Sequence, residues 1–154
     1  MARAYQSWSR AALLLAGVVA LDQIAKRLVQ HNIAEGDSDN VFLGINLVHV
    51  KNKGVAFGAF SGKPVVMVIV LFALGGLLLW FALHTERRFV WLPTGLLLGG
   101  ALGNIIDRVR DGAVTDFIKL PFWPAFNIAA MAITFGVLAL LYVLERGDAP
   151  DDPA

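Results

Sequence analysis

The organisation of this chain is decided by residues 99–130, which read GGALGNIIDRVRDGAVTDFIKLPFWPAFNIAA. A glycine-rich apolar segment ends here in Asn104 and Arg108. Another apolar segment opens after Asp116 and presents Asn127 near its start. Ionisable and amide groups at the ends of membrane-length apolar runs are costly to desolvate, so they are candidates for function. This stretch therefore predicts a polar site at a membrane surface.

The composition of the chain indicates an integral membrane protein. Of its 154 residues, 57% are hydrophobic and 16% are charged, whereas soluble domains carry about 25% charged residues. The net charge of +1 leaves no footprint for nucleic acid. The absence of cysteine excludes disulfides and thiolate metal sites, and His31, His49 and His84 lack metal-ligand spacing. We expect one membrane domain over residues 1–154, without metal or cofactor.

Four apolar segments are long enough to cross a hydrocarbon core of about 30 Å, which needs ~20 helical residues. We therefore predict an all-α integral membrane protein with four transmembrane helices. Because Asp22 and Lys26 continue the helical pattern of the first segment, we expect a retained span rather than a cleaved signal peptide. The short loop 84–89 with its arginines favours cytoplasmic termini. The predicted spans are residues 11–29, 65–83, 90–106 and 122–144, followed by a disordered tail over 147–154.

The segment between the first two spans, residues 30–63, predicts a small extracytoplasmic β element. Residues 35–40 have the composition of a turn, and residues 41–50 mix β-branched and aromatic side chains as strands do. Residues 55–60 are apolar but lie outside the spans. We expect them at the membrane interface or packed on the helices.

Asp22 and Lys26 stand four residues apart, so both face one side of the first helix and can form an ion pair. We interpret the pair as a structural salt bridge at the outer end of the span, with Lys26 reaching the interface, rather than as catalytic groups. The pair still contributes to a polar pocket.

The third span carries glycine at every fourth position, at Gly95, Gly99 and Gly103, a stripe that lets another helix approach closely. Asn104 and Arg108 are likewise four apart, and Arg108 can donate a forked pair of hydrogen bonds. Two interpretations stay open for both residues: contact with substrate, or a network that holds the following loop. For Asp107, between them, we expect a scaffold role.

Asp116 lies in a short strand-like stretch before the fourth span. Desolvation among apolar neighbours should raise its pKa, which suits general acid–base chemistry; the alternative is a solvated loop acid. Asn127 falls near the first turn of the last helix, where it can act in the site or cap the helix. A carboxylate at position 130 would complete a pair of acids, but Ala130 stands there.

These blocks resemble the motifs of lipoprotein signal peptidase (signal peptidase II), an aspartic peptidase family of bacterial inner membranes. The resemblance covers nearly all of the chain except its ends. It rests on five ordered blocks, namely residues 21–26, 52–57, 99–108, 114–117 and 126–130.

The resemblance implies cleavage of the signal peptide from a diacylglyceryl-modified prolipoprotein, on the amino side of the lipidated cysteine. It also implies cytoplasmic termini, a periplasmic β-cradle, an active site near the periplasmic face of the inner membrane, and membrane lipids as partners. We expect a monomer. Asp116 matches the first catalytic aspartate, and the expected substrate-binding positions are Asn52, Gly54, Asn104, Arg108 and Asn127.

The family's last motif, Phe-Asn-x-Ala-Asp, ends here in Ala130, so the second catalytic aspartate is missing. Asp107 is the only nearby acid that could replace it. An engineered truncation and an inactive relative both fit this sequence. We therefore expect a catalytically impaired peptidase or, as the alternative, a non-catalytic prolipoprotein-binding protein. A transporter is disfavoured because no internal repeat is visible.

Overall fold

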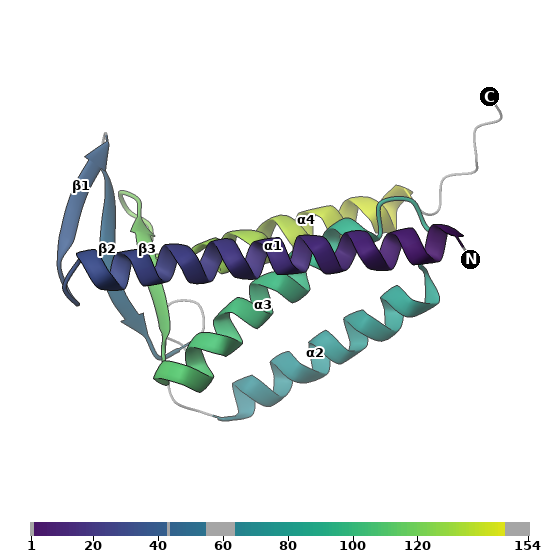
Figure 1. Cartoon of the computed structure of the whole chain (residues 1–154), viewed down its shortest axis with the longest axis horizontal. Helices are drawn as coiled ribbons and strands as arrows, with labels where there is room; N and C mark the ends of the chain where they lie inside the picture. Colours follow the sequence, from purple (N-terminus) through teal and green to yellow (C-terminus); the bar gives the residue numbers. More distant parts are fainter. Residues whose placement is uncertain (1, 43, 55–63, 147–154) are drawn as a thin grey trace.

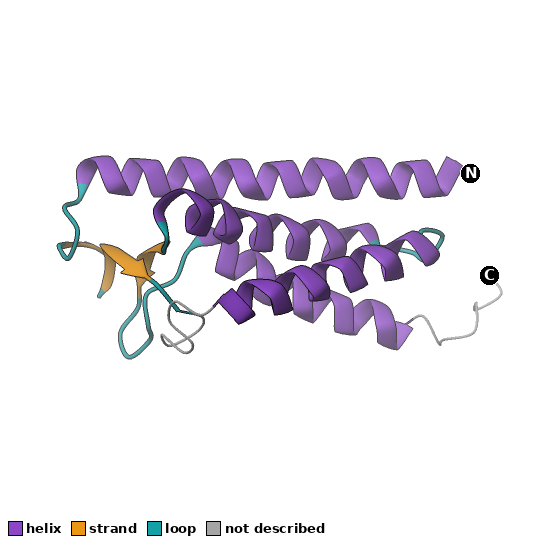
Figure 2. Cartoon of the chain, turned by 90° about the horizontal axis from the view of Figure 1, so that it is seen from below, coloured by secondary structure: helices purple, strands orange, loops and turns teal. Residues whose placement is uncertain are grey.

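The computed structural model describes residues 2–42, 44–54 and 64–146, which form four helices and one small antiparallel sheet. The sheet has the strand order β1-β2-β3 and lies across one end of the helices, as Figures 1 and 2 show. The elements are α1 Ala2–Asn32, β1 Ser38–Phe42, β2 Ile45–Asn52, α2 Pro64–Leu83, α3 Trp91–Asp111, β3 Val114–Lys119 and α4 Ile128–Arg146.

Helix α3 occupies the centre of the bundle, between α1 and α4, and α2 packs against it from the side (Figure 1). The glycines of α3 allow α1 and α4 to pack closely against it. A Cβ at Gly99 would lie 2.9 Å from Cβ of Val18 in α1, and one at Gly100 would lie 2.5 Å from the carbonyl oxygen of Ala129 in α4. The predicted small-residue stripe is thus a helix-packing surface.

The outer faces of α1, α2 and α4 present large apolar side chains, including Leu13, Phe72 and Leu138, which are 74%, 79% and 57% exposed. Among the described residues, only α4 is both long and apolar enough to cross a membrane. The described apolar part of α2, residues 68–83, is shorter.

The sheet differs from the prediction in three ways. The strand predicted over residues 41–50 is wrong, because Gly44, with φ +83°, turns the chain between β1 and β2. The predicted turn over residues 35–40 is too long, since β1 begins at Ser38. The third strand, β3, comes from the segment between α3 and α4, so the β element is not confined to residues 30–63.

Two helices also differ from the predicted segments. Helix α1 runs unbroken to Asn32, beyond the predicted 11–29. Helix α4 begins at Ile128 rather than near residue 122, because a turn containing Pro121 and an Asn127 cap precede it. The predicted interfacial segment 55–60 and the predicted tail 147–154 lie outside the described residues.

Candidate active site

Six of the buried polar residues that the structure describes gather where the sheet meets α1, α3 and the start of α4. Each is at most 5% exposed although it carries a charge, amide or hydroxyl group. They are Asp22, Lys26, Asp107, Thr115, Asp116 and Asn127.

Lys26 is the centre of a buried ion cluster, here called the Lys26 cluster, with Asp22 and Asp107. Its Nζ lies 2.6 Å from Oδ2 of Asp22 and 2.8 Å from Oδ2 of Asp107, and it donates to Oδ1 of Asn104 at 3.2 Å. The predicted pair of Asp22 and Lys26 is present. The prediction that Lys26 reaches the interface is wrong, since all three charged side chains are fully buried. Two carboxylates and an amide compensate its charge inside the protein.

The two carboxylates of the Lys26 cluster also hold the backbone. Asp22 Oδ1 accepts the N–H of Ala129 at 2.9 Å, and Asp107 Oδ2 accepts the N–H of Thr115 at 3.1 Å. A carboxylate at a helix N-terminus is favourable because it meets free N–H groups and the positive end of the helix dipole. The cluster thus fixes the residues immediately before positions 116 and 130.

Asp116, on β3, accepts one hydrogen bond on each carboxylate oxygen. Asn127 Nδ2 donates to Oδ1 at 2.7 Å, and Asn52 Nδ2 donates to Oδ2 at 3.0 Å. Backbone donors fix the orientation of both amides, because Asn52 Oδ1 accepts the N–H of Gly54 and Asn127 Oδ1 that of Ala130. Both oxygens of Asp116 therefore face donors, which suits the ionised carboxylate.

Burial raises the pKa of Asp116 above its ordinary value, as the sequence predicted. The hydrogen bonds from Asn52 and Asn127 and the positive charges of Lys26 and Arg108 oppose this rise. The carboxyl group is thus desolvated enough to hold a proton more readily than usual, while its partners keep the ionised form accessible.

Asn127 caps α4 and contacts Asp116 at the same time. Its Oδ1 accepts the N–H of Ala130 at 2.7 Å, the bond expected of an N-cap side chain. Its Nδ2 lies 3.2 Å from both Oδ1 of Asn104 and the carbonyl oxygen of Thr115. One amide group therefore connects the Asp116 carboxylate to the backbone of position 130.

Arg108 contacts the chain after β2 rather than Asp107, its neighbour in sequence. Its Nη2 donates to the carbonyl oxygen of Gly54 at 2.8 Å, and Nη1 lies 3.5 Å from that of Asn104. The structure thus contains the helix-end network, and the role of Arg108 in substrate contact stays a prediction. The predicted binding residues Asn52, Gly54, Asn104, Arg108 and Asn127 lie in one connected set around Asp116.

Sequence reasoning missed Gln23 and Thr115. Gln23 Nε2 donates to Oδ1 of Asp107 at 2.8 Å, and fully buried Thr115 Oγ1 accepts from Nε2 of Gln30 at 2.7 Å. Gln23 is next to Asp22 in a helix, where adjacent residues do not ordinarily face each other, so spacing gave no signal, although Gln23 Nε2 donates to Oδ2 of Asp22 at 3.3 Å. For Thr115 the signal was its position beside Asp116.

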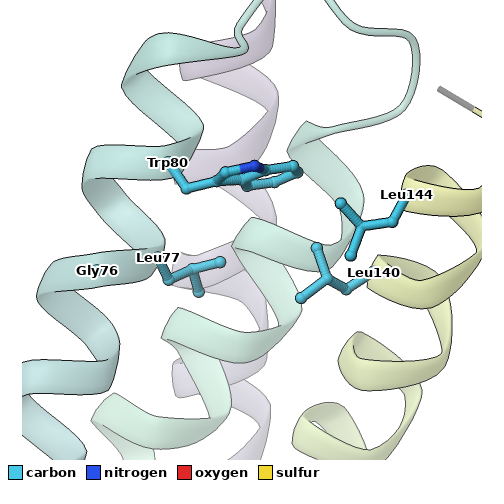
Figure 3. A pocket seen from close by; sticks show the side chains of 5 residues that line it. All are labelled: Gly76, Leu77, Trp80, Leu140 and Leu144. Atoms are coloured by element: carbon cyan, nitrogen blue, oxygen red, sulfur yellow. The ribbon is translucent and has the colours of Figure 1, made fainter. Parts of the chain in front are cut away.

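A separate apolar hollow of about 340 Å³ lies between α2 and α4, as Figure 3 shows. Gly76, Leu77 and Trp80 line it from α2, and Leu140 and Leu144 line it from α4. It contains no polar side chain that could react, and it shares no residue with the cluster around Asp116. Within the ranges that the structure describes, no group of three His, Cys, Asp or Glu side chains could hold a metal ion.

Known proteins resemble the chain over most of its length. A family profile described as "Signal peptidase (SPase) II" matches residues 14–145. The lipoprotein signal peptidase of Moorella thermoacetica is 42% identical over 146 residues, covering 92% of this chain and 97% of the relative. That of Halothermothrix orenii is 34% identical, covering 84% and 91%. A solved bacterial membrane enzyme structure, determined in meso, has a TM-score of 0.84 and 31% identity, covering 94% of this chain and 93% of its own.

Proposed function

Because the chain belongs to the signal peptidase II family of lipoprotein-processing membrane proteases, we propose that it has the architecture of an aspartic endopeptidase. Its substrates are diacylglyceryl-modified prolipoproteins, and the scissile bond lies on the amino side of the lipidated cysteine. Asp116 is the first catalytic position and residue 130 the second. In this chain Ala130 leaves the pair incomplete, so its peptidase activity is impaired.

The observation that supports this pairing is the double use of Asn127. Its amide nitrogen donates to Asp116 while its amide oxygen accepts the N–H of residue 130. A side chain amide is short, so the two positions that it connects are neighbours in space although they lie on different elements. A catalytic pair of carboxylates requires two positions that are this close in space.

With an acid at 130, the two carboxyl groups share one proton, since like charges so close cannot both ionise. Asp116, which accepts a hydrogen bond on each oxygen, is suited to the ionised state and to activating a water molecule. The protonated partner then polarises the scissile carbonyl and protonates the leaving amine. Asp116 alone cannot be both base and acid in one step.

Asp107 is not a replacement for the missing acid. It is fully buried, and it already accepts from Lys26, Gln23 and the N–H of Thr115. Freeing it would leave Lys26 short of one counter-charge. Because general acid–base assistance contributes about 10²–10⁴-fold, we expect the loss of the pair to cost at least that factor.

The experiment is to measure cleavage of a lipidated prolipoprotein by the chain and by its Ala130→Asp variant in the same detergent. We expect little or no turnover by the chain and clear turnover by Ala130→Asp. The matched control is Ala130→Asn, which adds a similar volume without a titratable group and should stay inactive. Comparable rates for the chain and Ala130→Asp would show that Asp116 works with another partner.

A second candidate function is a non-catalytic prolipoprotein-binding protein. The intact set of amide and guanidinium groups around Asp116, beside an alanine at 130, favours it. Failure of Ala130→Asp to gain activity while it binds a lipidated peptide would select this alternative.

We also propose that all four helices span the bacterial inner membrane as one monomeric domain, with cytoplasmic termini and Asp116 near the periplasmic face. The exposed apolar faces of α1, α2 and α4 support this arrangement. So do aromatic contacts far from the sheet, where Trp8 packs edge-on against Phe81 and Arg10 lies over the Trp91 ring. Tryptophan is typical of both membrane interfaces, and an excess of arginine is typical of the cytoplasmic side.

A further inference from the structure

The loop between β3 and α4 contains a turn with an unfavourable residue at its third position. The N–H of Trp123 donates to the carbonyl oxygen of Leu120 at 3.3 Å, which closes a turn over residues 120–123. Pro121 occupies the second position and Phe122 the third, with φ +61°. A proline followed by a positive φ is typical of a type II turn, whose third position favours glycine. Phenylalanine is strained there because its Cβ crowds the backbone.

Within the part of the chain that the structure describes, no packing contact offsets this strain. The relative exposure of Phe122 is 106%, and that of Trp123 is 57%. A large aromatic ring packed in a core could stabilise a strained backbone, but the ring of Phe122 faces away from the protein entirely. Two adjacent exposed aromatic rings are therefore costly unless something outside the chain covers them.

The backbone keeps this turn fixed at its base. Ile118 and Phe126 exchange two hydrogen bonds, at 2.9 and 3.0 Å, across the bottom of the loop. Lys119 Nζ donates to the carbonyl oxygen of Trp123 at 2.6 Å. The two rings are thus held outward by a closed loop.

The turn of the β1–β2 hairpin lies against the same loop. A Cβ at Gly44 would lie 3.3 Å from Cγ of Pro121. The hairpin residues on either side of this turn, Phe42 and Ile45, are themselves 64% and 37% exposed. Two neighbouring connections of the sheet therefore both present apolar side chains.

We propose that the loop of residues 120–124 binds the surface of a phospholipid bilayer, with Phe122 and Trp123 as its anchors. This inference rests on the proposed membrane-spanning arrangement: the loop leads through Asn127 directly into α4, the helix that is long and apolar enough to cross a membrane, and in that arrangement it lies close to the bilayer surface. Tryptophan is favoured at the headgroup level, where its apolar ring and polar N–H meet both environments, and phenylalanine occurs on the apolar face of segments that lie in the membrane interface. Lys119, beside the loop, adds a cation that suits lipid phosphates.

The absence of cysteine from the chain allows a direct test in bilayer nanodiscs. A spin label is placed on Phe122→Cys, on Leu138→Cys in α4, and on Glu35→Cys in the turn after α1, each of which is exposed. The readout is the accessibility of the label to oxygen, which enters the bilayer, compared with a water-soluble nickel chelate. We expect the ratio for position 122 to lie nearer that for position 138 than that for position 35.

Two results would overturn the proposal. A ratio at position 122 equal to that at position 35 would place the loop in water. A label at 122 shielded from both reagents would mean that protein, such as a second copy of the chain, covers the loop.

A second measurement keeps Phe122 in place. In a variant with Trp8, Trp80 and Trp91 replaced by phenylalanine, Trp123 is the only tryptophan. We expect lipids brominated near the headgroup end of the acyl chain to quench its fluorescence. Unchanged fluorescence would also overturn the proposal. Neither measurement depends on peptidase activity, so the proposed function and this inference fail separately.

Discussion

At the scale of single residues, the candidate site relies on side-chain amides that use both of their ends. Asn52 and Asn127 each accept a backbone N–H with the amide oxygen and donate to Asp116 with the amide nitrogen. Local backbone geometry and the state of the carboxylate are therefore connected. Loss of either amide would disturb a turn or a helix end as well as Asp116.

The titration of Asp116 makes stability depend on pH in a defined direction. Because burial raises its pKa in the folded state, the fold binds this proton more tightly than the unfolded chain does. The stabilisation that this proton gives the fold is therefore fully present when the pH is below the ordinary pKa of 3.8. It is lost as the pH rises through the raised pKa of the folded state. We expect Asp116→Asn to lack this dependence, whatever constant difference the substitution introduces.

The measurement is the free energy of unfolding in detergent, for both chains, over the acidic range. The chain should gain stability relative to Asp116→Asn as the pH falls through the raised pKa. The gain is about 1.4 kcal/mol for each pH unit that separates the pKa of the folded state from that of the unfolded state. A difference that does not change with pH would show that the pKa of Asp116 is the same in both states.

The role of Arg108 can be determined by comparing how its substitution changes the affinity for substrate and the free energy of unfolding. If it bonds a substrate carbonyl, Arg108→Ala should weaken binding of a lipidated peptide by roughly 1.5–3 kcal/mol, the range for hydrogen bonds to charged groups. If it only holds the carbonyl of Gly54, the free energy of unfolding should fall while affinity in the folded protein stays unchanged. A titration in nanodiscs beside a denaturation curve in detergent separates the two, and unchanged affinity would contradict the predicted substrate contact.

At the scale of elements, the Lys26 cluster joins four elements of the fold. Lys26 and Asp22 belong to α1, Asp107 belongs to α3, and the two carboxylates hold the N–H groups of Thr115 in β3 and Ala129 in α4. The relative position of β3 and α4 thus depends on a lysine that contacts neither position 116 nor position 130 through any hydrogen bond or ion pair found among the described residues.

Removing this lysine should be among the most harmful changes to the fold. Lys26→Met removes the cation between two buried carboxylates and leaves only Arg110, 3.6 Å from Oδ1 of Asp107, beside them, a loss of about 3–5 kcal/mol in the free energy of unfolding. The control combines Lys26→Met with Asp22→Asn and Asp107→Asn, which keeps an acceptor oxygen for each backbone N–H. We expect this triple variant to regain part of the loss in a denaturant titration; if it is less stable than Lys26→Met alone, charge imbalance is not the cause.

Helix contact at Gly100 gives a matched pair of glycine substitutions. A Cβ there would lie 2.5 Å from the carbonyl oxygen of Ala129, whereas one at Gly17 in α1 would meet nothing within 4 Å. Gly100→Ala should therefore lower the free energy of unfolding by about 1–3 kcal/mol through overpacking. Gly17→Ala should be neutral or raise it by up to about 1 kcal/mol through helix propensity. Equal effects of the two variants on thermal unfolding would contradict this packing.

At the scale of the whole molecule, the sequence predicted the presence and order of the four helices, missed several of their bounds, and predicted the sheet poorly. Hydropathy and length identify an apolar segment without any partner, so α2 and α3 fall close to their expected ranges. The hairpin was missed because Gly44 sits within a run of β-branched and aromatic residues that looks like one strand. The strand-like character of β3 was visible, but its pairing with β2 depends on residues distant in sequence.

The same distinction applies to the candidate site. Motifs indicated Asp116, Asn127 and the pair of Asp22 and Lys26, because each lies within a short recognisable block. Contact between Lys26 and Asp107 joins two helices and has no local signal, so the complete burial of Lys26 was not predicted. The sequence thus identifies polar residues within or beside apolar segments, and tertiary packing determines which of them are in contact.

The Lys26 cluster also bears on how such a chain can change over generations. Its three buried charges balance one another, with Arg110 at 3.6 Å from Asp107 as a further cation, so a substitution at one position alters which residues are acceptable at the other two. Substitutions at Asp22, Lys26 and Asp107 should therefore occur together rather than singly. A library randomised at all three positions and selected for folding would recover compensated sets, whereas recovery of single neutral replacements at each position would speak against this interdependence.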